Sequence, residues 1–346
     1  MLDGLGADAL IVTHLPNVRY LSGFTGSAGV YLAVQRPVFF TDGRYREQAS
    51  AQVSGARVVT ATGSALMAAA SACSEMGLKH VAIESEHLTV AQLDAVENAL
   101  GKGAEVIRLA GTVEELRILK DDEEVELLRN AVELSSRLFR PLLRSMRSGV
   151  VESAIAAKLE YMARKAGAER MSFETIVASG ERSALPHGVA SQAKLPTEGF
   201  VVLDYGIVRE GYCSDMTRTV HLGKASGEAR ALYSAVLNAQ LAAISAVRPG
   251  RTAGEVDRAA RQELKKAKLD RFFTHSTGHG VGLEIHEIPR VAALSETVLK
   301  PGMVITIEPG VYLPGRCGIR IEDMLLVTDD GYEVLTPVSK KLIELD

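Results

Sequence analysis

Four acidic side chains stand at the ends of apolar segments in the second half of this sequence. Asp204 closes the run GFVVLD, and Asp215 follows a turn at REG. Glu308 ends MVITIE, and Glu322 lies in IRIED. Carboxylates are almost never buried without a partner, so either pair taken alone is explained by strand ends that meet solvent. Both pairs together, with His279 among glycines between them, favour a shared ligand instead.

The spacing of the first pair predicts that its two acids share one face of a hairpin. If the turn consists of Arg209 and Glu210 alone, the acids are opposite each other, with Cβ atoms about 5 Å apart. A bulge at Gly211 would shift the register by one residue and make the pairing diagonal. Carboxylates this close repel each other, so either one of them takes up a proton or a cation lies between them.

Three of the eight histidines lie close together, in the segment FTHSTGHGVGLEIHE. His275 and His279 have the i, i+4 spacing of two zinc ligands on one face of a helix. The segment also holds Gly278, Gly280 and Gly282, and each glycine costs a helix interior about 1 kcal/mol relative to alanine. We therefore expect an extended strand that a ligand or another backbone approaches closely.

These side chains form a donor set dominated by oxygen. Four carboxylates would balance the charge of two divalent cations, and one imidazole adds a nitrogen donor. Structural zinc sites are instead closed sets of cysteine and histidine. An oxygen-rich set with one nitrogen suits Mn²⁺, Co²⁺, Fe²⁺ or catalytic Zn²⁺ in a two-metal arrangement. Water between two such ions loses a proton readily, which provides a nucleophile at neutral pH.

The pattern of elements divides the chain into two domains. Over residues 1–117, short apolar runs such as ALIVTH and HVAIES alternate with helical patterns such as SALMAAASACSEMG, which predicts an α/β domain. The pattern changes at LKDDEEVELLRNAV, where Asp121 or Asp122 can cap a long helix. Residues 118–346 then combine further helices with strand pairs around the four acids. We expect an α+β fold.

Composition narrows the partners and the compartment. The 346 residues are 47% hydrophobic and 24% charged, enough to build cores, and a net charge of −4 disfavours nucleic acid and anionic lipid as partners. Three cysteines without CxxC spacing favour a reducing compartment over a disulfide scaffold. No apolar run is long enough for a membrane span, and the N-terminus lacks the pattern of a signal peptide. We therefore expect a cytoplasmic protein.

The chain resembles the pita-bread metallopeptidases, peptidase family M24, whose metal ligands have the same types and order as Asp204, Asp215, His279, Glu308 and Glu322. DYGIVREGYCSDMTRTV, STGHGVGLEIHE, TIEPGVY and RIED are similar to the motifs that carry those ligands. NVRYLSGFTGSAG and FFTDGRYREQA resemble the N-terminal, creatinase-like domain of the proline-specific branch. The resemblance covers nearly the whole chain, and it implies a creatinase-like α/β domain over residues 1–117 and a pita-bread catalytic domain over residues 118–346.

The resemblance implies two divalent metal ions per chain, with Mn²⁺ as the first choice and Co²⁺ or Zn²⁺ as alternatives. Asp215 and Glu322 would bridge the ions, Asp204 would hold one of them, and His279 and Glu308 would hold the other. A metal-bridging hydroxide would attack the substrate carbonyl. Glu308 would also pass a proton from the attacking water toward the leaving nitrogen.

Three further histidines match positions around the substrate in the family. His187, in LPHG within the substrate-side loop VASGERSALPHGVAS, and His286, in IHE, would steady the substrate carbonyl and its oxyanion. His275 matches a histidine that lines the same pocket. A purely structural hydrogen bond remains the alternative for His275 and His286.

Within the family, the chain resembles proline dipeptidase and aminopeptidase P, so the expected substrates are Xaa-Pro dipeptides or peptides with proline in the second position. Phe173, Ile285 and Tyr312 are candidate walls for the pyrrolidine ring, with a general core position as the alternative. FTGSAG is similar to aminopeptidase P. Arg290 matches an arginine that holds the substrate's C-terminal carboxylate in proline dipeptidases, with an exposed loop cation as the alternative. The choice between the two activities stays open.

Other interpretations share parts of this pattern. Methionine aminopeptidase has the same five-ligand set but normally lacks an N-terminal α/β domain. Creatinase shares the two-domain layout without the metal ligands. A pita-bread pseudoenzyme that serves as a binding module usually loses ligands, whereas this chain has all five. By analogy with the family, we also expect a homodimer.

Overall fold

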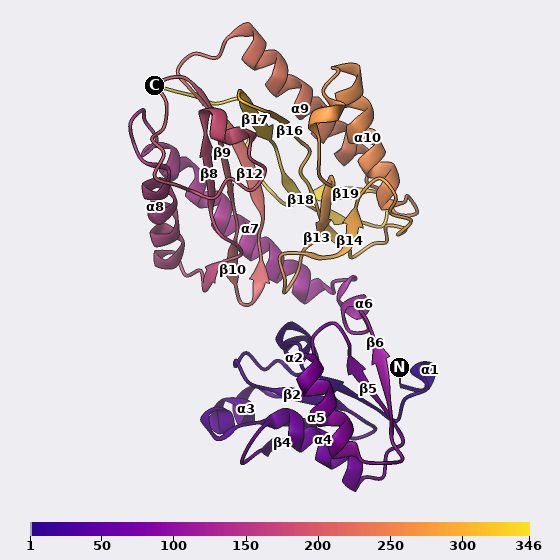
Figure 1. The fold of residues 1–346 in the computed structure, drawn as a ribbon. Helices are drawn as coiled ribbons and strands as arrows, with labels where there is room; N and C mark the ends of the chain where they lie inside the picture. Colours follow the sequence, from indigo (N-terminus) through magenta and orange to yellow (C-terminus); the bar gives the residue numbers. More distant parts are fainter. Residues whose placement is uncertain (1) are drawn as a thin grey trace. The chain divides into compact units, whose positions relative to one another are not determined.

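The computed structural model describes residues 2–346, and the chain divides into two compact units between Arg117 and Ile118. Figure 1 shows the fold of both units and labels most of their helices and strands. The first unit has a six-stranded sheet, and the strands of the second form sheets of two to five strands. Among the described residues, no helix is both long and apolar enough to span a membrane.

The sheet of the first unit has the strand order β4-β3-β2-β1-β5-β6. β1, β5 and β6 are parallel neighbours, β3 and β4 are also parallel, and β2 pairs antiparallel with β1 and β3. The strands are β1 (Ala9–Val12), β2 (Val30–Ala33), β3 (Val38–Thr41), β4 (Arg57–Thr60), β5 (His80–Glu84) and β6 (Glu105–Leu109). The helices are α1 (Leu2–Leu5), α2 (Leu15–Ser22), α3 (Arg46–Gln52), α4 (Ala65–Glu75), α5 (Val90–Leu100) and α6 (Glu114–Arg117).

Strand β1 explains why helices cover both faces of this sheet. Its residues are all buried: Ala9 and Ile11 belong to one apolar cluster, and Leu10 and Val12 belong to another. Successive residues of a strand point to opposite faces, so a strand that is buried on both faces reads as a continuous apolar run. Side chains of α4 and α5 complete the first cluster, and side chains of α2 and α3 complete the second. This is the α/β arrangement that the sequence predicts.

The second unit combines four long helices with mostly antiparallel strands (Figure 1). The helices are α7 (Asp122–Leu143), α8 (Glu152–Lys165), α9 (Gly227–Ala246) and α10 (Ala253–Lys266). The strands are β7 (Arg170–Met171), β8 (Ile176–Ser179), β9 (Gly199–Tyr205), β10 (Ile207–Arg209), β11 (Tyr212–Cys213), β12 (Met216–Leu222), β13 (Gly278–Gly280), β14 (Glu287–Val291), β15 (Val304–Ile307), β16 (Gly310–Leu313), β17 (Cys317–Arg320), β18 (Asp323–Val327), β19 (Tyr332–Val334) and β20 (Glu344–Leu345). The mixture is the predicted α+β class.

Helix α7 begins at one of the two predicted caps. The side chain of Asp121 accepts a hydrogen bond from the backbone N–H of Glu124, whose carboxylate accepts one from the backbone N–H of Asp121. This capping box satisfies N–H groups that the first turn of a helix leaves without partners. Leu128 and Val132 are buried on the inward face of the helix.

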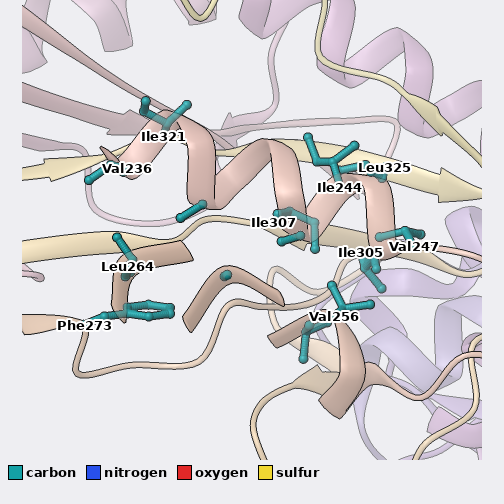
Figure 2. Close-up of a cluster of buried hydrophobic side chains, with 14 of the residues drawn as sticks. Val236, Ile244, Val247, Val256, Leu264, Phe273, Ile305, Ile307, Ile321 and Leu325 are labelled. Atoms are coloured by element: carbon teal, nitrogen blue, oxygen red, sulfur yellow. The ribbon is translucent and has the colours of Figure 1, made fainter. Parts of the chain in front are cut away.

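Helices α9 and α10 pack an apolar core against β15 and β18, as Figure 2 shows. Val236 and Ile244 come from α9, and Val256 comes from α10. They share one buried cluster with Ile305 of β15 and Leu325 of β18. Because interiors are packed as densely as organic crystals, this core holds firmly the strands that lead into and out of the second acidic pair.

Candidate active site

The first acidic hairpin has a register different from the predicted one. Its two-residue turn consists of Glu210 and Gly211, which both have positive φ (50° and 82°), as a type I′ turn requires. The turn therefore lies one residue later than predicted, and Asp204 pairs with Thr217 instead of Asp215. The pairing changes by two residues, an even number, so both acids still point to the same face, as diagonal neighbours.

The strands of this hairpin are interrupted beside Asp215. β9 is separated from β10 by Gly206, and β11 is separated from β12 by Ser214 and Asp215. A Cβ atom on Gly206 would lie 1.8 Å from the carbonyl oxygen of Ser214, so only glycine allows this close approach of the two backbones. The interruption leaves Asp215 outside the regular ladder, with its carboxylate buried.

Glu308 and Glu322 fall in a similar interruption of the second hairpin. β15 pairs with β18 on one side of it and β16 pairs with β17 on the other, in one continuous register. In that register Glu308 and Glu322 are opposite each other. The hydroxyl of Thr217 donates a hydrogen bond of 2.7 Å to Oε2 of Glu322. Thr217 therefore joins the two hairpins, because it is also the partner of Asp204 in the first.

His279 lies in a strand, β13, as its neighbouring glycines predict. A Cβ atom on Gly278 would lie 1.9 Å from the Thr306 carbonyl oxygen, and one on Gly280 would lie 2.4 Å from that of Ile288. Both glycines are therefore required by the close approach of the neighbouring strands. The imidazole Nδ1 is 3.0 Å from the Gly280 carbonyl oxygen. A carbonyl can only accept, so Nδ1 carries the proton and Nε2 is left as an acceptor or metal ligand.

Carboxylates and imidazole converge in the second unit. Nε2 of His279 lies 3.6 Å from Oδ2 of Asp215 and 3.4 Å from Oε1 of Glu308. Donor atoms of Asp215, His279 and Glu322 all lie within 4.8 Å of one another. Oδ1 of Asp204 and Oδ1 of Asp215 are buried without a hydrogen-bond partner. Unpartnered carboxylate oxygens are costly in a protein interior. These two oxygens are therefore well suited to be ligands of a cation.

The electrostatics of this cluster also indicate that it needs bound cations. Burial raises the pKa of Asp215 and Glu322, and the neighbouring carboxylates raise both further. Burial also raises the pKa of Glu308 to about 7, and it lowers the pKa of His279. Without cations, the folded chain therefore resists carrying these negative charges together. The donor set, its unpartnered oxygens and its charge all fit divalent ions.

Arg320 is a member of the site that sequence reasoning did not single out. Its guanidinium is buried, and it donates to the carboxylate of Asp204 and, over 2.7 Å, to the hydroxyl of Tyr312. Its remaining contacts include the hydroxyl of Thr217. It partly compensates the negative cluster and fixes one of its carboxylates. The sequence does contain a signal for Arg320, because this residue stands two positions before Glu322 in the RIED motif.

The residues that the sequence nominates all line one cavity of about 640 Å³ in the second unit. They are Asp204, Asp215, His279, Glu308 and Glu322 as ligands, His187, His275 and His286 as further histidines, and Arg290 and Phe173 as substrate contacts. Ile285 and Tyr312, the other candidate walls, line it too. Their location makes the proposed roles possible, and each role remains a hypothesis.

The three further histidines differ in how they are held. His286 is exposed, and its ring meets that of His279 edge to face with centroids 4.4 Å apart. His187 is also exposed, in the loop after the short helix η2 (Gly180–Ala184). His275 is fixed on both sides: Nδ1 donates to the Ser276 carbonyl, and Nε2 lies 2.9 Å from the Tyr312 hydroxyl. Burial lowers the pKa of His275 to about 4, so it is neutral at physiological pH.

Arg290 and Phe173 both line the cavity. Arg290 is exposed on β14, where it is the strand partner of His279. Phe173 is half-buried and precedes β8. A guanidinium is suited to bind a negatively charged end of a small substrate.

Comparison with known proteins identifies the family of each part of the chain. Residues 126–329 match the model of metallopeptidase family M24, and residues 1–119 match the creatinase/prolidase N-terminal domain. An uncharacterized peptidase of Bacillus subtilis, YqhT, is 40% identical over 342 residues, which cover 99% of this chain and 97% of that protein.

Solved structures of peptidases are similar to this chain over nearly its whole length. An Xaa-Pro dipeptidase from Bacillus anthracis has a TM-score of 0.96 and 43% identity, covering 99% of this chain and 97% of that chain. An X-Pro aminopeptidase from Thermotoga maritima has a TM-score of 0.92 and 35% identity, covering 99% of both chains. These matches confirm the predicted resemblance and the predicted order of a creatinase-like domain followed by a pita-bread domain. The chain therefore belongs to metallopeptidase family M24 and is a peptidase.

Proposed function

We propose that this chain is an Xaa-Pro peptidase that works with two divalent metal ions. The main support is the convergence of Asp204, Asp215, His279, Glu308 and Glu322 from three separate segments of the chain into one cavity. The names of the similar proteins support the substrate class, since they include an Xaa-Pro dipeptidase and an X-Pro aminopeptidase. Membership of a metallopeptidase family itself implies divalent metal ions.

We assign the metal ligands as the family pattern suggests. Asp215 and Glu322 would contact both ions, Asp204 would complete one site, and His279 and Glu308 would complete the other. Two such ions, when bound, supply an activated water and a polarised substrate carbonyl. Mn²⁺ is our first choice for the resident metal, because the donor set is mostly carboxylate oxygen.

The other residues would orient the substrate and move protons. Glu308 would take a proton from the attacking water and deliver it to the leaving proline nitrogen. His187 and His286, both exposed to the cavity, would donate hydrogen bonds to the oxyanion that develops at the carbonyl. His275 is a neutral group whose imidazole is hydrogen-bonded to the Tyr312 hydroxyl, which fits a positioning role.

The cavity also has the features that a proline substrate needs. An Xaa-Pro bond is a tertiary amide, so its nitrogen has no N–H for an enzyme to recognise. Recognition must therefore use the ring and the chain ends. Phe173, Ile285 and Tyr312 would contact the pyrrolidine ring, and Arg290 would bind the C-terminal carboxylate of a dipeptide.

Rates of hydrolysis of Ala-Pro, Ala-Pro-Ala and longer peptides in Mn²⁺, Co²⁺ and Zn²⁺ would test this function. We expect cleavage on the N-terminal side of proline, with faster turnover of Ala-Pro if Arg290 has the proposed role. Met-Ala-Ser serves as the control substrate for methionine aminopeptidase activity, which the creatinase/prolidase N-terminal domain argues against. Absence of Xaa-Pro cleavage with all three metals, or preference for Met-Ala-Ser, would contradict the proposal.

A further inference from the structure

A second cluster of potential metal ligands lies in the first unit. β1, β5 and β6 are adjacent and parallel in its sheet. His14 follows β1, His87 follows β5, and Glu114 follows β6. All three residues thus lie beyond the carboxyl ends of neighbouring parallel strands, where open α/β sheets generally bind their ligands.

The three side chains are in contact. The imidazole rings of His14 and His87 stack, with centroids 3.7 Å apart and planes 9° from parallel. Nε2 of His87 lies 3.0 Å from Oε1 of Glu114. One donor atom from each residue lies within 4.8 Å of the other two. The side chains of His87 and Glu114 are 26% and 21% exposed, so an ion can reach the cluster from solvent.

Buried polar groups hold this cluster in place. The carboxylate of Glu84 accepts the backbone N–H of His14 over 2.8 Å, and its backbone carbonyl accepts that of His87 over 3.2 Å. The amide of Asn17 donates to Glu84 and to Oε1 of Glu114, over 2.7 Å in each case. Asn17 is itself fully buried. A supporting shell of this kind orients metal ligands and strengthens binding.

We propose that His14, His87 and Glu114 bind a borderline divalent transition metal ion, with Zn²⁺ as the best match. Two imidazoles and one carboxylate form a three-ligand zinc set whose fourth position is filled by water. Nitrogen donors favour Zn²⁺, Ni²⁺ or Cu²⁺ over Mg²⁺ or Mn²⁺. The ion takes the place of the proton between His87 and Glu114, and the rings rotate out of their stack so that both lone pairs face it.

Such an ion would connect the loops that follow three strands of the sheet. The site uses none of the five proposed catalytic ligands and does not depend on the proposed function. The competing explanation is that stacking and the His87–Glu114 ion pair serve the fold alone. The two explanations differ in the number of zinc ions that the chain binds.

Zinc counting on the full-length protein distinguishes them. Wild type and the variants His87→Ala and His14→Ala are dialysed against Zn²⁺ at neutral pH, and bound zinc is measured by elemental analysis. We expect each variant to hold one zinc ion fewer per chain than wild type. His80→Ala is the matched control, because His80 is an exposed histidine at the other end of β5, and it should bind as many ions as wild type.

A more conservative variant tests the same site with less risk of misfolding. Glu114→Gln keeps an oxygen acceptor for Asn17 but removes the negative charge, and we expect the zinc affinity of this site to fall by about tenfold or more. Hydrolysis of Ala-Pro in Mn²⁺ should be unchanged in all these variants, which separates this test from that of the proposed function. Equal zinc counts in wild type and folded His87→Ala, or an equal loss in His80→Ala, would overturn the proposal.

Discussion

Glu308 is the residue whose change should separate chemistry from folding. It lies 3.4 Å from Nε2 of His279, with its side chain 17% exposed. Glu308→Gln keeps the shape of the side chain but cannot take up a proton. We expect the turnover number for Ala-Pro to fall by about 10²–10⁴-fold, with little change in the thermal unfolding midpoint. Steady-state kinetics and metal analysis of the same sample would check this, and wild-type turnover with full metal occupancy would refute the shuttle role.

Arg290 should decide the preferred length of substrate. A hydrogen bond between charged groups contributes about 1.5–3 kcal/mol, which corresponds to roughly 10–150-fold in kcat/KM. We expect Arg290→Ala to lower kcat/KM for Ala-Pro by that factor and to change it much less for Ala-Pro-Ala. Arg290→Lys is the matched variant, because it keeps the charge but loses bidentate geometry. An equal loss for both peptides would show that Arg290 acts through the fold or through the electrostatic field of the site, and does not bind the C-terminal carboxylate.

Single-residue signals in the sequence were strong for the acids and weak for their partners. A carboxylate at the end of an apolar run is conspicuous, so Asp204 and Glu322 could be nominated without a structure. Arg320 could not be paired in the same way, because its contact with Asp204 crosses 116 positions and depends on how two hairpins meet. The hairpin register depended on whether Glu210 adopts positive φ, which is uncommon for residues other than glycine.

At the scale of elements, strands were predictable where they are buried. β1, β3 and β5 are largely buried and stand out as apolar runs. β4 and β6 form the edges of the six-stranded sheet and are partly exposed, and neither gave a clear pattern. An edge strand buries less apolar surface, so its sequence is less constrained. The interruptions in the two hairpins were not predictable, because they depend on contacts between strands.

One buried ion pair links the start of α7 to β14. Nζ of Lys120 lies 2.9 Å from Oε2 of Glu287, with the side chains 1% and 5% exposed. Lys120→Met removes the cation but leaves the buried carboxylate, which should cost about 3–5 kcal/mol of unfolding free energy. The double variant Lys120→Met with Glu287→Met should recover much of that loss. Denaturant unfolding would measure both.

An exposed ion pair provides the control for this prediction. Lys266 and Glu263 lie on the surface of α10, where Lys266 is 71% exposed. Lys266→Met should therefore change the unfolding free energy by less than about 1 kcal/mol. Equal effects of Lys120→Met and Lys266→Met would show that the buried pair has no special part in holding β14, and with it Arg290, in place.

At the scale of the whole molecule, each unit has apolar clusters of its own. The two units should therefore respond separately to metal. The proposed Mn²⁺ ligands all belong to the second unit, and a ligand that binds only the folded state stabilises it by about 2.7 kcal/mol at a hundred times its Kd. The homodimer also remains a prediction, which the molecular mass in solution, measured by sedimentation, would test.

Hydrogen exchange with and without Mn²⁺ would locate this stabilisation. We expect Mn²⁺ to slow amide exchange in β9, β12, β15 and β18, because their ends carry the four carboxylate ligands, which repel one another until cations neutralise them. The six-stranded sheet of the first unit should exchange at the same rate in both samples. Asp215→Asn removes a proposed bridging ligand and should abolish the protection. Protection that is equal in both units, or that survives Asp215→Asn, would place the manganese somewhere other than in this carboxylate cluster.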